Sequence, residues 1–183
     1  MRMKTEATIE DLYNVPENGN AELVDGEVVV MAASGPEHGR AAMKIAFSLY
    51  EYELKVGWGH VAPDNVGFIV HLPHRGSFSP DAAYYVGPAG GLDFVEGAPL
   101  FAVEVRSKND YGAVAGRAMA AKRADYFAAG TQVVWDVDLL SPEVVRVYRI
   151  DRPEEPMVYV RGEMAEAEPA LPGWQMGVDQ LFM

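Results

Sequence analysis

Cysteine is absent from the 183-residue chain, and basic residues are scarce, with 15 Lys and Arg against 27 Asp and Glu. Without cysteine there is no disulfide framework, no thiolate metal site and no cysteine nucleophile, which leaves carboxylates and four histidines as candidate metal ligands. No apolar run approaches the roughly 20 residues that span a bilayer, and the first residues lack the apolar segment of a signal peptide. We therefore expect a cytoplasmic protein that does not associate with membranes.

The formal net charge of −12 argues against general, sequence-independent adhesion to nucleic acid, which depends on clustered Lys and Arg. The charge is unevenly distributed, however. Residues 104–123 include five basic side chains and only two acidic ones, whereas residues 151–168 are rich in acids. Such a local basic segment is compatible with a phosphate-bearing substrate, although a solvated helix face has the same composition.

Apolar residues make up 49% of the chain and charged residues 23%, as is usual for a soluble globular protein. With no repeat and no change of composition, one domain over residues 1–183 is expected. Periodicity, caps and turn residues predict the following elements: a helix at 8–15 capped by Thr8, a hairpin at 21–32 around Asp25-Gly26, a helix at 38–56, strands at 66–72 and 77–86, a Gly/Pro-rich loop at 87–99, a strand at 101–105, a helix at 113–129 ending at Gly130, a parallel strand at 132–137, a hairpin of 144–150 and 157–162 joined by DRPEEP, and a terminal helical turn.

One acidic residue, Glu104, interrupts the apolar strand predicted at 101–105. Alternation places Ala102, Glu104 and Arg106 on one face and the larger apolar residues on the other. Because an unpaired buried carboxylate is costly, Glu104 is expected to be paired, protonated or bound to a metal. An ion pair with Arg106 or Lys122, which needs no metal, is the alternative to a metal site.

Asp81 follows Pro80 at the start of a second β-like run, so it can converge with Glu104 if the two strands are neighbours. Two carboxylates at adjacent strand ends are a usual oxygen site for Mg²⁺ or Mn²⁺, and the backbone carbonyl of Val105 would complete it. Taken alone, Asp81 is better explained as a turn or cap residue, and only Glu104 beside it favours the metal site.

Lys122 lies on an apolar stripe of the predicted helix at 113–129, from which its ammonium could reach over the carboxylates. There it could stabilise developing phosphate charge or orient the attacking water. It could instead lie along the core with its head in water. Arg106 stands two residues after Glu104 and can hold a phosphate, but arginine is a poor general base.

These residues carry a family resemblance. The order Pro80-Asp81, then Glu104-Val105-Arg106, resembles the PD-(D/E)XK nuclease superfamily with the final lysine replaced. More of the chain is similar to the Uma-type putative restriction endonucleases, whose pattern is matched at Glu22 to Gly26 (ELVDG), His38, Pro80-Asp81, Glu104-Val105 with Ser107, Lys122, Tyr126, Gly130, Trp135, Val137-Asp138 and the closing LPGWQMGVDQLF.

The resemblance implies an α/β fold, with a restriction-endonuclease-like mixed β-sheet core flanked by helices and additional β-hairpins. It also implies Mg²⁺ or Mn²⁺ held by Asp81 and Glu104, Lys122 as the displaced catalytic lysine, and a homodimer. Glu22 and His38 become candidate substrate-positioning residues through this match alone, since each is otherwise explained as a surface or cap residue. His60, His71 and His74 lack a paired metal spacing and are not assigned to a site.

The resulting hypothesis is a metal-dependent phosphodiesterase of nuclease type that acts on DNA. Asp81, Glu104 and Val105 would bind the metal, Lys122 would act in catalysis, and Arg106 would hold a phosphate. Two alternatives remain: an inactive nuclease-fold module that binds nucleic acid or a protein partner, and a hydrolase for a small phosphorylated molecule.

Overall fold

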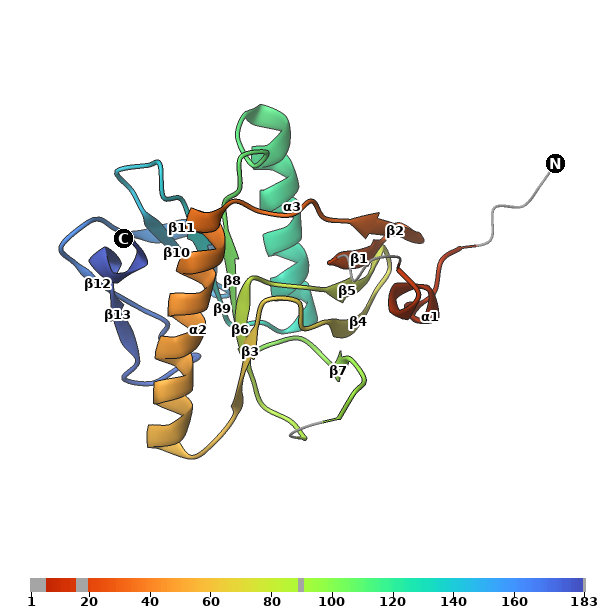
Figure 1. Cartoon of the computed structure of the whole chain (residues 1–183), viewed down its shortest axis with the longest axis horizontal. Helices are drawn as coiled ribbons and strands as arrows, with labels where there is room; N and C mark the ends of the chain where they lie inside the picture. The colour runs from red at the N-terminus through yellow and green to blue at the C-terminus, as the bar shows by residue number, and fades with distance from the viewer. Residues whose placement is uncertain (1–5, 16–19, 89–90, 183) are drawn as a thin grey trace.

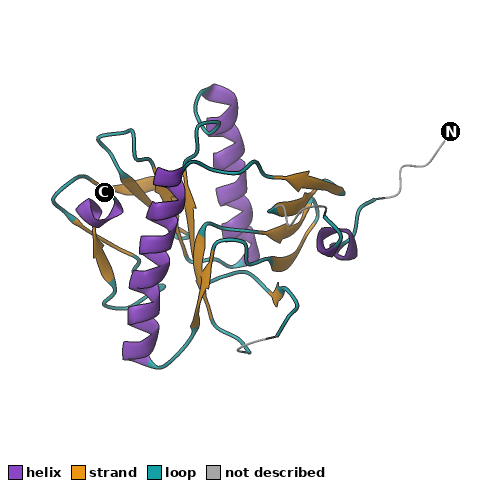
Figure 2. Ribbon diagram, in the orientation of Figure 1, coloured by secondary structure: helices purple, strands orange, loops and turns teal. Residues whose placement is uncertain are grey.

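The structure is a computed structural model that describes residues 6–15, 20–88 and 91–182 (Figures 1 and 2). Its α-helices are α1 (Ile9–Tyr13), α2 (Pro36–Val56) and α3 (Ala113–Ala129), and a 3-10 turn, η2 (Val178–Leu181), lies near the C-terminus. All three predicted helices and the terminal turn are confirmed. Helix α2 begins two residues earlier than expected, because the fixed φ of Pro36 suits the first helical position.

A tight hairpin forms where Asp25-Gly26 predicts one. Strands β1 (Ala21–Val24) and β2 (Glu27–Val30) pair antiparallel, and Asp25 and Gly26 have φ of 50° and 70°. Positive φ at both central residues is the requirement of this two-residue turn. The hairpin brings β1 alongside β5 (Arg75–Phe78), where Val24 pairs with Arg75.

The central six-stranded sheet has the order β11-β10-β9-β8-β6-β3. Its strands are β3 (His60–Pro63), β6 (Ala82–Tyr85), β8 (Phe101–Val105), β9 (Val133–Val137), β10 (Val145–Arg149) and β11 (Arg152–Tyr159). Only β8 and β9 are parallel, which confirms the predicted crossover through α3. Strand β8 therefore lies between β6, which follows Asp81, and β9.

A second sheet has the order β2-β1-β5-β4-β7, and β12 and β13 form a separate antiparallel pair. The remaining strands are β4 (Phe68–Leu72), β5 (Arg75–Phe78), β7 (Val95–Glu96), β12 (Met164–Glu166) and β13 (Gln175–Gly177). Strand β3, which pairs with β6, was not predicted, and β7 lies inside the predicted loop at 87–99. Two-residue strands such as β7 are held by their neighbours and carry no periodicity of their own.

The prediction of DRPEEP as a connecting loop was wrong. Strand β11 begins at Arg152, so most of this segment is strand, and the turn is confined to Ile150 and Asp151. Proline removes a ladder hydrogen bond and is tolerated at the edge of a sheet. Because β11 is an edge strand, Pro153 and Pro156 fit there.

The two longer helices stand on opposite sides of β8 (Figure 1). Buried residues of α2, among them Ile45 and Leu49, pack in one core cluster with Phe101 and Val103. Ala102 belongs to a second cluster that includes Tyr126 of α3. The predicted alternation along β8 is therefore confirmed, and Glu104 faces α3. No helix in the described ranges is both long enough and apolar enough to cross a membrane.

Candidate functional site

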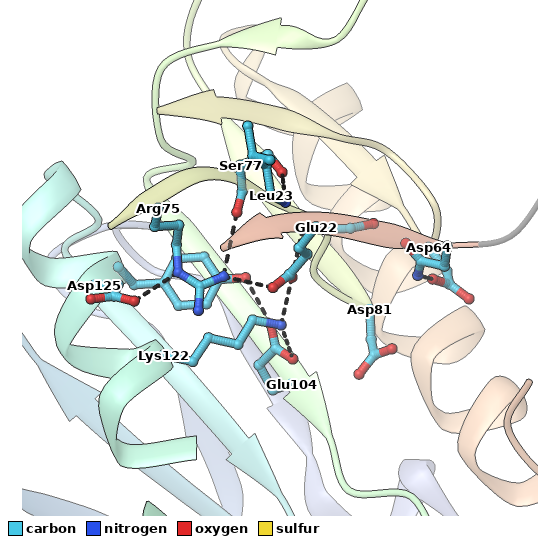
Figure 3. Close-up of polar contacts among 12 residues, drawn as sticks. Glu22, Leu23, Asp64, Arg75, Ser77, Asp81, Glu104, Lys122 and Asp125 are labelled. Carbon is cyan, nitrogen blue, oxygen red and sulfur yellow. Dashed lines mark hydrogen bonds and ion pairs between the residues drawn. The ribbon is translucent and has the colours of Figure 1, made fainter. Parts of the chain in front are cut away.

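Glu104 near the end of β8 is held by two side chains of α3. The ammonium of Lys122 lies 2.8 Å from Oε1 and from Oε2 of Glu104 (Figure 3). The Tyr126 hydroxyl donates to Oε1 at 2.7 Å. Lys122 and Tyr126 are four residues apart, so they lie on the same face of the helix. Of the two ion pairs considered for Glu104, the one with Lys122 is present. Among the described residues, Arg106 pairs with Asp136 and Asp138 instead.

Glu22 of β1 reaches the same ammonium from the second sheet. Its Oε1 lies 2.8 Å from Lys122 Nζ and accepts the Ser79 N–H at 2.9 Å. Although burial raises the pKa of Glu22, the nearby Lys122 and Arg75 cations hold it below its ordinary value. Glu22 is therefore a buried acid of the site and not the solvent-facing residue that its position before a hairpin turn suggests.

Asp81 links the start of β6 to the end of β8. Its Oδ2 accepts the Val105 N–H at 2.6 Å, and its Oδ1 lies 3.3 Å from Nε2 of His38 on α2. The hydrogen bond to Asp81 raises the pKa of His38 against the opposing effect of burial. His38 is 9% exposed, and its Nδ1 has no hydrogen-bond partner among the described residues. Asp81 and His38 thus form a second part of the site beside Glu104.

The charges of these groups influence one another. Burial raises the pKa of Glu104 to about 7, since the lowering effect of Lys122 is offset by burial together with the negative charges of Asp81 and Glu22. Burial disfavours the charged form of Lys122, but Glu104 and Glu22 raise its pKa above the ordinary value, so the ammonium stays charged. The site therefore combines a permanent cation with a carboxyl group that titrates near neutral pH.

Arg106 directly follows the last residue of β8, and its side chain turns toward β9. Its guanidinium forms a bidentate pair with Asp136, with bonds of 2.8 and 2.7 Å, and lies 3.7 Å from Asp138. The hydrogen bonds to Asp136 raise its pKa further above the ordinary arginine value. The structure thus brings Glu22, His38, Asp81, Glu104 and Lys122 together, and places Arg106 in a separate ion pair.

The chain is similar to known proteins over almost its whole length. The profile of the Uma2 family, described as "Putative restriction endonuclease", matches residues 7–179. The chain belongs to this family. A crystal structure of a putative nuclease belonging to DUF820 from Anabaena variabilis is similar, with a TM-score of 0.73 and 16% identity over 96% of this chain and 97% of that one. The predicted fold, a restriction-endonuclease-like mixed sheet flanked by helices, is thereby confirmed. No curated protein matches the chain.

The oxygen donors of this Uma2-family chain suit a hard divalent cation. Asp81 and Glu104 offer carboxylates and Val105 a backbone carbonyl, and Mg²⁺ is commonly held by one or two carboxylates with water and substrate phosphate. Burial is the main cause of the raised pKa of Glu104, and the negative charges of Asp81 and Glu22 add to it; a bound cation would favour the ionised form of this carboxyl. Within the described ranges, no group of three or more His, Asp and Glu side chains is arranged to hold a metal.

Arg75, Asp125 and His74 join the same network but were not predicted. Arg75 bonds to both Glu22 and Asp125 (Figure 3). Asp125 Oδ1 lies 2.6 Å from His74 Nε2. In the sequence, His74 and Arg75 belong to the turn-like PHRG, and no local signal distinguishes them from surface residues. Only the pairing of β1 with β5 brings Arg75 to Glu22.

Proposed function

We propose that this Uma2-family protein is a Mg²⁺-dependent phosphodiesterase of nuclease type that acts on DNA. One observation carries the proposal: the Lys122 ammonium lies within 2.8 Å of both Glu104 and Glu22, on the side of β8 where Asp81 is also found. Acids on adjacent strand ends with a basic group at hand are the parts that metal-assisted phosphate hydrolysis requires. Family membership supports the same activity.

Asp81 and Glu104 would hold Mg²⁺ or Mn²⁺, assisted by the Val105 carbonyl. When bound, the metal supplies Lewis-acid polarisation of a phosphate oxygen and lowers the pKa of a coordinated water. Lys122, which stays protonated, stabilises the negative charge that develops on the phosphate or orients the attacking water through its N–H groups. Glu22 and His38 are positioning residues, since each contacts one of these groups directly.

DNA binding would use the basic residues that follow Glu104. Arg106 can contact a phosphate bidentately, as it contacts Asp136 in this structure, so DNA would compete with Asp136 for the guanidinium. Because the net charge is −12, binding is expected to be confined to this region and to weaken steeply with added salt.

One observation favours the inactive nuclease-fold module as a second candidate. Both oxygens of Glu104 are already satisfied by Lys122 and Tyr126, so the carboxylate has partners without a metal. Such a module would bind nucleic acid or a protein partner without cleaving it. Metal binding separates the two candidates.

Calorimetric titration of Mg²⁺ and Mn²⁺ is expected to show binding by the wild type and binding at least about tenfold weaker in Asp81→Ala and Glu104→Ala, because each loses a charged oxygen ligand. Glu166→Ala is the matched control, since Glu166 is as exposed as Glu104 (22% and 23%) and pairs with Arg149 away from the site. A wild type that binds neither ion, or unchanged binding in both variants, contradicts the catalytic proposal.

We further propose that the expected homodimer forms through the solvent face of α2. Four large apolar residues on this face are exposed, at spacings of four, three and four residues: Met43 (51%), Phe47 (63%), Tyr50 (47%) and Leu54 (67%). This is the spacing of a helix-to-helix seam. An antiparallel pair with its two-fold axis at Ile45 would place Met43 opposite Phe47.

The charges beside this seam suit the same pairing. Arg40 and Glu51 are both exposed on α2 and lie toward opposite ends of the helix. In the antiparallel pair, Arg40 of one copy would lie beside Tyr50 and Glu51 of the other, and the reverse contact repeats by symmetry. In this register Tyr50 faces Arg40 and Leu54 faces Pro36 of the other copy, so Met43 and Phe47 form the apolar centre of the contact, and Arg40 and Glu51 form its charged flank.

Phe47→Glu is expected to convert a dimer into a monomer of 20.0 kDa, because it places two like charges near the centre of the seam. Sedimentation equilibrium measures the mass. Leu140→Glu is the control, since Leu140 is 76% exposed and lies outside α2. A monomeric wild type, or a Phe47→Glu variant that stays dimeric, rules out this interface.

A further inference from the structure

Arg75 of β5 is a buried arginine, 8% exposed, that lies between two carboxylates of different elements. Its Nη1 donates to Glu22 Oε2 at 2.7 Å, and its Nε donates to Asp125 Oδ2 at 2.7 Å (Figure 3). The rigid, planar guanidinium holds two acceptors in fixed directions, which the single ammonium of lysine does not. Arg75 therefore ties β1 to α3 by a buried bridge.

Each of the two carboxylates that Arg75 binds is connected to Lys122, one by direct contact and the other through helix α3. Glu22 contacts Arg75 through Oε2 and Lys122 through Oε1. Asp125 lies on α3, three residues after Lys122, so it occupies the same side of the helix. The position of the Lys122 ammonium thus depends on a carboxylate and on a helix that Arg75 holds in place.

The charge balance gives Arg75 a further effect. Lys122 is shared between Glu22 and Glu104, while Arg75 supplies Glu22 with a second cation. Removing one counter-ion of a buried carboxylate leaves its charge under-compensated, which favours a closer approach of the remaining cation. Without Arg75, Glu22 would therefore draw the Lys122 ammonium toward β1 and away from Glu104.

We infer that Arg75 is a positioning residue, which acts through Glu22 and Asp125 to keep the Lys122 ammonium on Glu104. Its effect on DNA cleavage rests on the proposed function, but its effect on Lys122 does not. The aromatic residues next to Arg75 support the positioning role. The Arg75 guanidinium lies 4.9 Å from the centre of the Phe78 ring, and the Phe78 ring stacks on Tyr126 with ring centres 4.0 Å apart. Tyr126 in turn bonds to Glu104.

The first test needs no enzymatic activity. The ¹H–¹⁵N signal of the Lys122 ammonium, assigned by its loss in Lys122→Met, is expected to shift or broaden in Arg75→Lys. Arg149→Lys is the matched control, since Arg149 is also largely buried and bonds to Glu166 and to the Glu168 carbonyl. A Lys122 signal that is unchanged in Arg75→Lys overturns the inference.

The second test is a double-mutant cycle on plasmid cleavage. Arg75→Lys is expected to lower kcat by about tenfold or more through misplacement of Lys122. In a protein that already carries Glu22→Gln, Arg75→Lys should lower kcat little further, because both substitutions act on the same contact. A purely structural role of Arg75 predicts that the two losses of kcat add, and additive losses would overturn the inference.

The inference can still be tested if Arg75→Lys does not fold or if the wild type has no nuclease activity. If Arg75→Lys does not fold, Asp125→Asn removes the charge at the other end of the bridge and is followed by the same signal and the same rate. If the wild type cleaves no DNA, the proposed function fails, and the Lys122 signal alone decides whether Arg75 positions the ammonium.

Discussion

Lys122→Met is expected to lower the rate of supercoiled plasmid nicking by about 10²–10³-fold, the usual cost of removing one donor that stabilises transition-state charge. Methionine has a similar length but no charge, so Glu104 and Glu22 keep their places while the ammonium between them is lost. Mg²⁺ binding should be retained, because a cation that competes for Glu104 has been removed. Nicking and calorimetry on the same preparation separate these two effects.

The matched control for this variant is Lys44→Met. Lys44 is also partly buried and donates a hydrogen bond to the Phe182 carbonyl, outside the candidate site. Equal rates in the wild type and Lys122→Met would exclude a catalytic role for Lys122. If Lys122→Met unfolds, Lys122→Arg keeps the charge and changes only its shape, and it should restore folding with little activity.

Glu104→Gln is expected to remove much of the pH dependence of stability in the metal-free protein. The pKa of Glu104 is raised from an ordinary value of 4.5 to about 7 in the folded state, chiefly by burial. The folded protein thus binds this proton more tightly than the unfolded chain does. The resulting stabilisation is fully present below about pH 4.5 and is lost as the pH rises through about 7, at a cost on the order of 3 kcal/mol.

Urea unfolding between pH 5 and pH 8 in a chelating buffer measures this effect, as the difference between Glu104→Gln and the wild type. That difference should grow in favour of Glu104→Gln as the pH rises. His38 contributes a slope of the same sign, because its pKa is also raised, so some pH dependence should remain in Glu104→Gln and disappear with His38→Gln. A difference that is constant with pH would show that Glu104 does not titrate in this range.

Local residues were sufficient to predict most of the elements that support the site. Asp25-Gly26 specifies its turn because both residues tolerate positive φ, and Gly130 ends α3 at φ 108° for the same reason. The alternation of β8 was sufficient to place Glu104 opposite the larger apolar residues of the strand. Such features depend on a few neighbouring residues, so they can be predicted from the sequence alone.

Pairing between distant segments decided the rest of the site. Glu22 and Arg75 are separated by more than 50 residues, and only the contact between β1 and β5 makes them partners. Arg106 shares a face with Glu104, yet it binds Asp136, because the register of β8 with β9 places that acid within reach.

The carboxylates, the lysine and the strand that carries Glu104 were thus determined by the sequence itself, through residue type, periodicity and turn chemistry. The tertiary structure decided which cation each buried carboxylate receives. The physical reason is that burial makes an unpaired charge costly, so partners are selected by distance in the folded protein and not by separation along the chain.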